Sequence, residues 1–120
     1  MKKIIVLLLI TALTLSCQSQ SDPKIKVLPT ATYKEAIAKG NVQIVDVRTP
    51  EEFSEGAISN AININVNGES FESDIQKLDK KQPVYVYCRS GARSQKAAEK
   101  MIALGFTQVI DLEGGYLSWQ

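Results

Sequence analysis

Short apolar runs and short amphipathic segments alternate along this chain. Residues 42–47 (VQIVDV), 84–87 (VYVY) and 108–112 (QVIDL) are rich in β-branched side chains and predict strands, the first of them buried. Residues 61–66 predict a further short strand. Because helical segments separate these strands, the pattern predicts an α/β layer fold with a parallel sheet.

Helix signals lie between the predicted strands. Thr32 and Glu35 have the spacing of a capping box and Gly40 supplies a stop, so we expect one short helix there. Residues 49–52 (TPEE) predict a second helix, with threonine at the N-cap, proline at N1 and glutamate at N3. Later helical positions are Phe71, Ile75 and Leu78, which share one face, and residues 94–104, which Gly105 ends.

The first residues of the chain resemble a leader. Two lysines precede the apolar run 4–15, which is too short to span a bilayer as a helix, so residues 1–16 predict a secretory signal peptide. The run stops directly before Cys17, which resembles the bacterial lipoprotein signal, in which that cysteine carries lipid and becomes the first residue. The alternative is plain secretion with cleavage near Ser16. Residues 17–24 then form a polar tether, and residues 25–120 form one folded domain.

The leader also predicts a location. We expect an exported protein at the periplasmic face of a bacterial membrane, where the lipid on Cys17 is its one membrane attachment. Plain secretion would instead give a soluble periplasmic protein. Membrane fractionation of the expressed chain tests this expectation.

Charge and composition narrow the partners. The formal net charge is +1 and becomes −1 once the two leader lysines are removed. Neither value indicates binding to nucleic acid. We expect a monomer with small-molecule partners.

Two cysteines and no histidine narrow the chemistry. If Cys17 carries lipid, Cys88 is the only remaining thiol, which excludes an internal disulfide and a four-cysteine zinc site. The lack of histidine excludes Ser-His-Asp and Cys-His catalysis and any histidine-bound metal. Cys88 therefore acts without an imidazole.

The segment around Cys88 predicts an anion-binding loop. Cys88 follows the strand 84–87, and ligands of open parallel sheets bind beyond the carboxyl ends of strands. The helix beginning near Ser94 adds a partial positive charge, and Arg89 and Arg93 add full charges, which favour a thiolate over a thiol. Three small residues allow successive backbone N–H groups to point inward as an anion nest: Ser90, Gly91 and Ala92.

Arginine is scarce in this chain and concentrated near the predicted site. Its three arginines are Arg48, Arg89 and Arg93, each at a predicted strand end or in the loop. Arginine forks suit bidentate recognition of oxyanions. We expect Arg93 to contact substrate, and we expect Arg48 to pair structurally with Glu51 or Glu52.

Two anion chemistries compete at such a loop. Protein tyrosine phosphatases separate their cysteine and arginine by five residues, whereas four lie between Cys88 and Arg93. A shorter loop forms a smaller cradle, which suits one extra sulfur atom better than a tetrahedral phosphate or arsenate. No aspartate is placed by sequence as a general acid. The comparison favours sulfur chemistry.

Three ordered motifs then resemble the rhodanese (thiosulfate sulfurtransferase) domain of the single-domain type. The pattern C-R-x-G-x-R matches residues 88–93, and D-V-R matches residues 46–48, followed by P-x-E-[FY] at 50–53. The closing G-G-x-x-x-W matches residues 114–119. Residues 56–65 depart from the family, because its histidine, second glycine and proline are replaced there.

The resemblance implies a five-stranded parallel sheet flanked by short helices. It also implies that the Cys88 thiolate takes the outer sulfur of thiosulfate, or of a related donor such as polysulfide, and passes it as a persulfide to cyanide or a thiol. Arg89 and Arg93 would attract the donor, Asp46 and Arg48 would support the site, and no metal or organic cofactor is needed. The alternatives are a non-catalytic rhodanese-like module for binding or thiol sensing, and a small phosphate or arsenate enzyme. Packing or turn roles without chemistry are expected for Gly114, Gly115 and Trp119.

Overall fold

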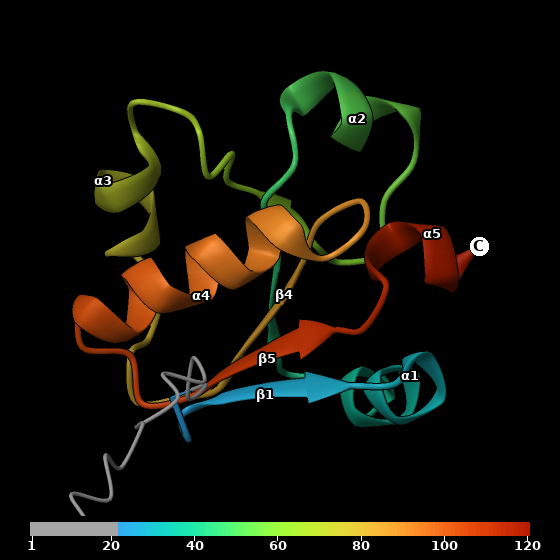
Figure 1. Cartoon of the computed structure of the whole chain (residues 1–120), viewed down its shortest axis with the longest axis horizontal. Coiled ribbons are helices and arrows are strands. Elements are labelled where there is room, and N and C mark those ends of the chain that lie inside the picture. The colour runs from blue at the N-terminus through green and yellow to red at the C-terminus, as the bar shows by residue number, and fades with distance from the viewer. Residues whose placement is uncertain (1–21) are drawn as a thin grey trace, which may run out of the picture.

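The computed structural model describes residues 22–120. The predicted signal peptide, Cys17 and most of the predicted tether lie outside the described residues. Five parallel strands form one sheet in the order β1-β5-β4-β2-β3, with helices on both faces (Figure 1). The strands are β1 (Ile25–Leu28), β2 (Gln43–Asp46), β3 (Ile62–Asn63), β4 (Val84–Tyr87) and β5 (Val109–Leu112). The helices are α1 (Thr30–Ala38), α2 (Pro50–Glu55), α3 (Phe71–Ile75), α4 (Ala92–Ala103) and α5 (Gly115–Trp119).

The strands confirm the predicted α/β fold with a five-stranded parallel sheet. The three longest predicted runs became β2, β4 and β5. β3 is shorter than the predicted run 61–66, although the amides of Ile64 and Val66 still donate to the carbonyls of Asp46 and Val47. β1 was not predicted, because its two central residues are exposed at the edge of the sheet and leave no apolar pattern.

The helix starts were predicted with mixed success. The capping box at Thr32 is wrong: α1 begins at Thr30 after Pro29, and no side chain caps it. The capping box of α2 is confirmed, because Thr49 accepts from the Glu52 amide and Glu52 accepts from the Thr49 amide. α4 begins two residues before the predicted start, and α5 was not predicted as a helix.

Each face of the sheet packs against its own helices, because successive strand residues point to opposite sides. Toward α3 and α4 lie the buried side chains of Val84, Val86 and Val109. Toward α1 and α5 lie Tyr33, Tyr87, Ile110 and Leu112, and partly buried Trp119 meets Tyr33 edge-on at 6.2 Å between ring centroids. Each fully buried apolar side chain contributes about 1.5–3 kcal/mol.

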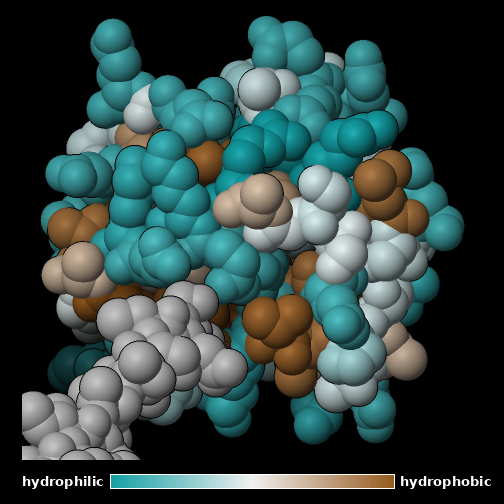
Figure 2. Space-filling model, viewed as in Figure 1, coloured by the Kyte–Doolittle hydropathy of each residue, from teal (hydrophilic) through white to brown (hydrophobic). Residues whose placement is uncertain are grey.

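α4 shows how one helix serves both the core and the surface. Its inner face buries Ala97, Ala98 and Met101 against the sheet, while Lys96 and Glu99 are exposed. The molecular surface over this helix is accordingly hydrophilic (Figure 2). Among residues 22–120, no helix has the length and apolar character needed to cross a bilayer.

Candidate active site in the loop between β4 and α4

Cys88 is the first residue of the loop that joins β4 to α4. Its side chain is 1% exposed and belongs to the core cluster that contains Val86 and Ala97. The Gly91 amide donates to the Cys88 sulfur at 3.0 Å, and the thiol donates to the Ser94 hydroxyl at 3.3 Å. The sulfur therefore faces the inside of the loop, whereas the sequence suggested only cations and small residues around it.

The predicted anion loop is folded by local conformations. Gly91 has φ +120°, a left-handed conformation that favours glycine, so the chain can turn sharply between strand and helix. Ser94 is buried and donates to the Gly91 carbonyl at 3.0 Å, which ties the first turn of α4 to the loop. Because α4 begins at Ala92, the positive end of its dipole adjoins the sulfur. Ser90 and Arg89 are exposed on the outside of the loop.

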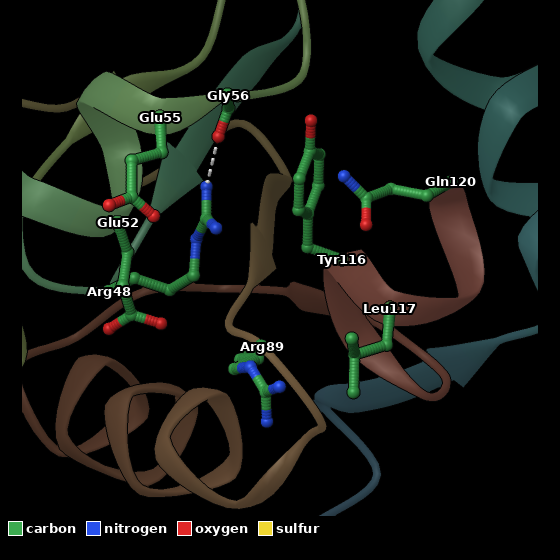
Figure 3. Close-up of a pocket in the computed structure, with 8 residues that line it drawn as sticks. All are labelled: Arg48, Glu52, Glu55, Gly56, Arg89, Tyr116, Leu117 and Gln120. Atoms are coloured by element: carbon green, nitrogen blue, oxygen red, sulfur yellow. Dashed lines mark hydrogen bonds between the residues drawn. The ribbon is translucent and has the colours of Figure 1, made fainter.

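Arg48 lies at the end of β2 and is buried. Its Nη2 is 2.6 Å from Asp46 Oδ2, and it also donates to the Gly56 carbonyl at 2.7 Å, which Figure 3 marks as a dashed line. The guanidinium carbon lies 4.4 Å from the ring centroid of Tyr116 and 5.6 Å from that of Tyr87. The predicted pairing of Arg48 with Glu51 or Glu52 is therefore wrong, because Asp46 two residues earlier holds the guanidinium.

Glu52 pairs instead with Arg93. Arg93 Nη1 and Nη2 donate to the two carboxylate oxygens at 2.6 and 2.9 Å, a bidentate pair that joins α4 to α2. The Arg93 guanidinium holds the pKa of Glu52 down at about 2, with a smaller contribution from the Thr49 amide. The fork that we expected to contact substrate thus already has a protein partner. Arg89 forms no ion pair with any of the described residues, and its side chain points away from Arg48 (Figure 3).

Replacing Glu52 with glutamine should lower the free energy of unfolding at pH 7 by about 1 kcal/mol, because a partly buried bidentate pair is lost. The folded pKa of about 2 lies below the ordinary value of 4.5, so this stabilisation is complete above pH 4.5 and disappears as the pH falls through about 2. Urea unfolding at pH 7, 4 and 2 measures it. Glu51→Gln, in the same exposed first turn of α2, is the matched control. A difference that stays constant down to pH 2 contradicts this assignment.

α5 fixes the backbone of the loop from the other side. The amides of Tyr116 and Leu117 donate to the carbonyls of Cys88 and Arg89 at 2.8 and 3.1 Å. Gly115 has φ +63°, and a Cβ there would lie 2.5–2.6 Å from the Arg89 carbonyl group and the Cys88 oxygen. The sequence analysis gave this glycine only a packing or turn role. Two successive glycines before an aromatic residue could have indicated a close backbone approach.

A small pocket opens beside the loop. Its volume is about 260 Å³, and Cys88 is not among the residues that line it. The wall carries several charges, yet most are already paired, so Arg89 and Glu55 are left without an ion pair among the described residues. The pocket is lined by Arg48, Glu52, Glu55, Gly56, Arg89, Tyr116, Leu117 and Gln120 (Figure 3).

Comparisons with known proteins agree with this architecture. The pattern of the family described as the rhodanese-like domain matches residues 30–120. The thiosulfate sulfurtransferase GlpE of Coxiella burnetii is 34% identical over 72% of this chain and 78% of its own length. The uncharacterized protein YqhL of Bacillus subtilis is 32% identical over 99% of this chain and 94% of its own. The crystal structure of a rhodanese-like domain protein from Staphylococcus aureus superposes with a TM-score of 0.71 at 33% identity, covering 79% of this chain and 91% of that one.

Proposed function

This chain belongs to the rhodanese-like domain family, and on that premise we propose that it is a sulfurtransferase of the thiosulfate type. The observation that carries the proposal is the contact between the Gly91 amide and the Cys88 sulfur at the carboxyl end of β4. A backbone donor aimed at sulfur stabilises the negative charge that a thiolate or persulfide carries there. A relative named as a thiosulfate sulfurtransferase at 34% identity supports the same chemistry.

The proposed reaction has two displacements at sulfur. The Cys88 thiolate attacks the outer sulfur of thiosulfate, a bond forms between the two sulfurs, and sulfite leaves with the electron pair of the broken bond. A thiolate acceptor, or cyanide, then attacks the outer sulfur of the persulfide and releases the Cys88 thiolate. Electrons balance between donor and acceptor, so neither step uses an external oxidant or reductant.

The surroundings of Cys88 favour small donors. Its side chain is 1% exposed, so the reacting sulfur of the donor has to enter the loop itself. Arg89, the arginine without an ion pair, supplies positive charge beside the pocket and would attract a dianionic donor such as thiosulfate. Arg93 acts on the loop through Glu52, where it ties the start of α4 to α2.

Mass spectrometry of the intact protein tests the proposal directly. After treatment with thiosulfate and removal of the excess, we expect one added sulfur atom on Cys88, which cyanide then removes. Polysulfide and an aryl phosphate complete the donor panel, and a sample alkylated at Cys88 is the control. Failure of every sulfur donor would favour a non-catalytic binding or thiol-sensing module. Hydrolysis of the aryl phosphate without sulfur uptake would favour a phosphate enzyme.

A further inference from the structure

The buried thiol of Cys88 needs an acceptor for its proton before it can attack. The chain has no histidine, and the sulfur is 1% exposed, so bulk water has little direct access to it. In the structure the thiol donates to the Ser94 hydroxyl at 3.3 Å. A serine hydroxyl can accept a proton only if it passes its own proton onward, because it is a weak base. The group beyond Ser94 therefore decides where the proton goes.

Asp111 on β5 lies on the same side of the sheet as Cys88. Val86 of β4 is paired in register with Asp111, and Asp111 reaches Gln95 of α4, whose amide nitrogen donates to Oδ2 at 2.7 Å. The residue is 2% exposed. Among the buried side-chain nitrogen and oxygen atoms of residues 22–120, Asp111 Oδ1 is the one without a hydrogen-bond partner. An unpaired oxygen on a buried carboxylate is costly, which marks it as a position kept for a proton or a donor.

The charge around Asp111 makes it a better base than an ordinary aspartate. Burial raises its pKa, while the side chains of Gln95 and Ser94 and the Leu112 amide oppose that rise. Ser94 thus borders both the carboxyl group and the Cys88 sulfur. No Lys or Arg of residues 22–120 forms an ion pair with Asp111, and Arg93 at the loop is held by Glu52.

The remaining titratable neighbours do not take this role. Tyr33 from α1 is influenced by Asp111, and burial, followed by the Asp111 charge, raises the Tyr33 pKa far above its usual range. Its hydroxyl donates to the Val86 carbonyl, so it remains a neutral donor on the other face of the sheet. The ionisable groups that face Asp111 are therefore Cys88, reached through Ser94, and this neutral phenol.

We propose that Asp111 accepts the proton of Cys88 through the Ser94 hydroxyl, as the substitute for the missing histidine. The thiol proton moves to Ser94 Oγ while the Ser94 hydroxyl proton turns from the Gly91 carbonyl and moves to Asp111 Oδ1. The carboxylate becomes a neutral acid and the sulfur becomes a thiolate. After the acceptor has removed the outer sulfur, the same path returns the proton to Cys88. The use of this thiolate for sulfur transfer rests on the proposed function, whereas the proton path does not.

The test is the pH dependence of Cys88 reactivity toward methyl methanethiosulfonate, a small reagent that does not require sulfurtransferase activity. In the wild type the rate should be nearly constant from pH 9 down to the pH at which Asp111 itself binds a proton. In Asp111→Asn it should fall about tenfold per pH unit, because the thiol then loses its proton only to solvent. At pH 6 we expect a deficit on the order of a hundredfold, with the two proteins converging at alkaline pH.

Two further variants keep the test decisive. Ser94→Ala breaks the path at its centre and should give the same pH profile as Asp111→Asn. Glu113→Gln removes one negative charge from an exposed position two residues away and should leave the profile unchanged. Thermal unfolding checks that each protein is folded; if Asp111→Asn does not fold, the Ser94 variant decides.

Each outcome has a defined meaning. A rate that is lower by one constant factor at every pH shows a structural role for Asp111 and overturns the proposal. A faster reaction at low pH also overturns it, because it shows that the carboxylate only repels the thiolate. If the profile changes as expected but thiosulfate adds no sulfur to the wild type, the proton path stands and the proposed function fails. If thiosulfate adds sulfur while the profiles coincide, the function stands and this proton path fails.

Discussion

Replacement of Cys88 by serine should abolish sulfur transfer from thiosulfate to cyanide and leave the fold intact. The alcohol cannot form the persulfide, and loss of a nucleophile lowers turnover by at least about a thousandfold. Folding should survive, because the smaller hydroxyl can still accept from the Gly91 amide and donate to Ser94, the two contacts of the thiol. We expect a stability loss of about 1 kcal/mol for burying a more polar group.

A steady-state assay together with urea unfolding measures both parts of this result. Cys88→Ala is the informative companion, because it leaves the Gly91 amide without its partner and should cost more stability than serine does. Turnover that persists in a folded Cys88→Ser protein would remove Cys88 from the mechanism.

Substitution of Gly115 by alanine should have the largest effect on stability of any change at the site. The left-handed backbone at φ +63° costs about 1–2 kcal/mol for a residue with a Cβ. That Cβ would also lie 2.5 Å from the Arg89 oxygen, and such overpacking costs typically about 1–3 kcal/mol more. We therefore expect a loss of about 3 kcal/mol, with α5 displaced from the carbonyls of Cys88 and Arg89 and turnover reduced.

Gly40→Ala is the matched control for this change. Gly40 also has a left-handed backbone, at φ +77°, but nothing lies within 4 Å of a Cβ placed there. Urea unfolding of both variants separates the conformational cost, which they share, from the collision, which only Gly115→Ala suffers. Equal losses in the two proteins would show that the approach of α5 to the loop does not constrain the site.

Elements with local signals were predictable. β2, β4 and β5 have continuous apolar runs because helices cover both faces of the sheet, and α2 has a capping box formed within four residues. Elements defined by distant contacts were not. β1 is an exposed edge strand without an apolar pattern, and α5 exists where its amides meet the loop carbonyls.

The site divides in the same way. The position of Cys88 at a strand end follows from the order of residues, so sequence reasoning could find it. The partners of the arginines could not be found, because Arg93 and Glu52 are 41 residues apart and meet only when α4 packs beside α2. Asp111 was missed as well: in the sequence it is one acidic residue inside a strand, and its unpaired oxygen appears only in three dimensions.

The docking of α5 gives this protein an optical reporter. The chain has a single tryptophan, Trp119, and it lies on the helix whose amides bind the loop carbonyls. Its ring is partly buried, faces the edge of Tyr33 and has the Lys34 ammonium 4.6 Å from its centroid. Release of α5 would transfer the indole to water and shift its fluorescence emission to longer wavelength. The spectrum of the unlabelled protein thus follows, in real time, whether the backbone around Cys88 is held in place.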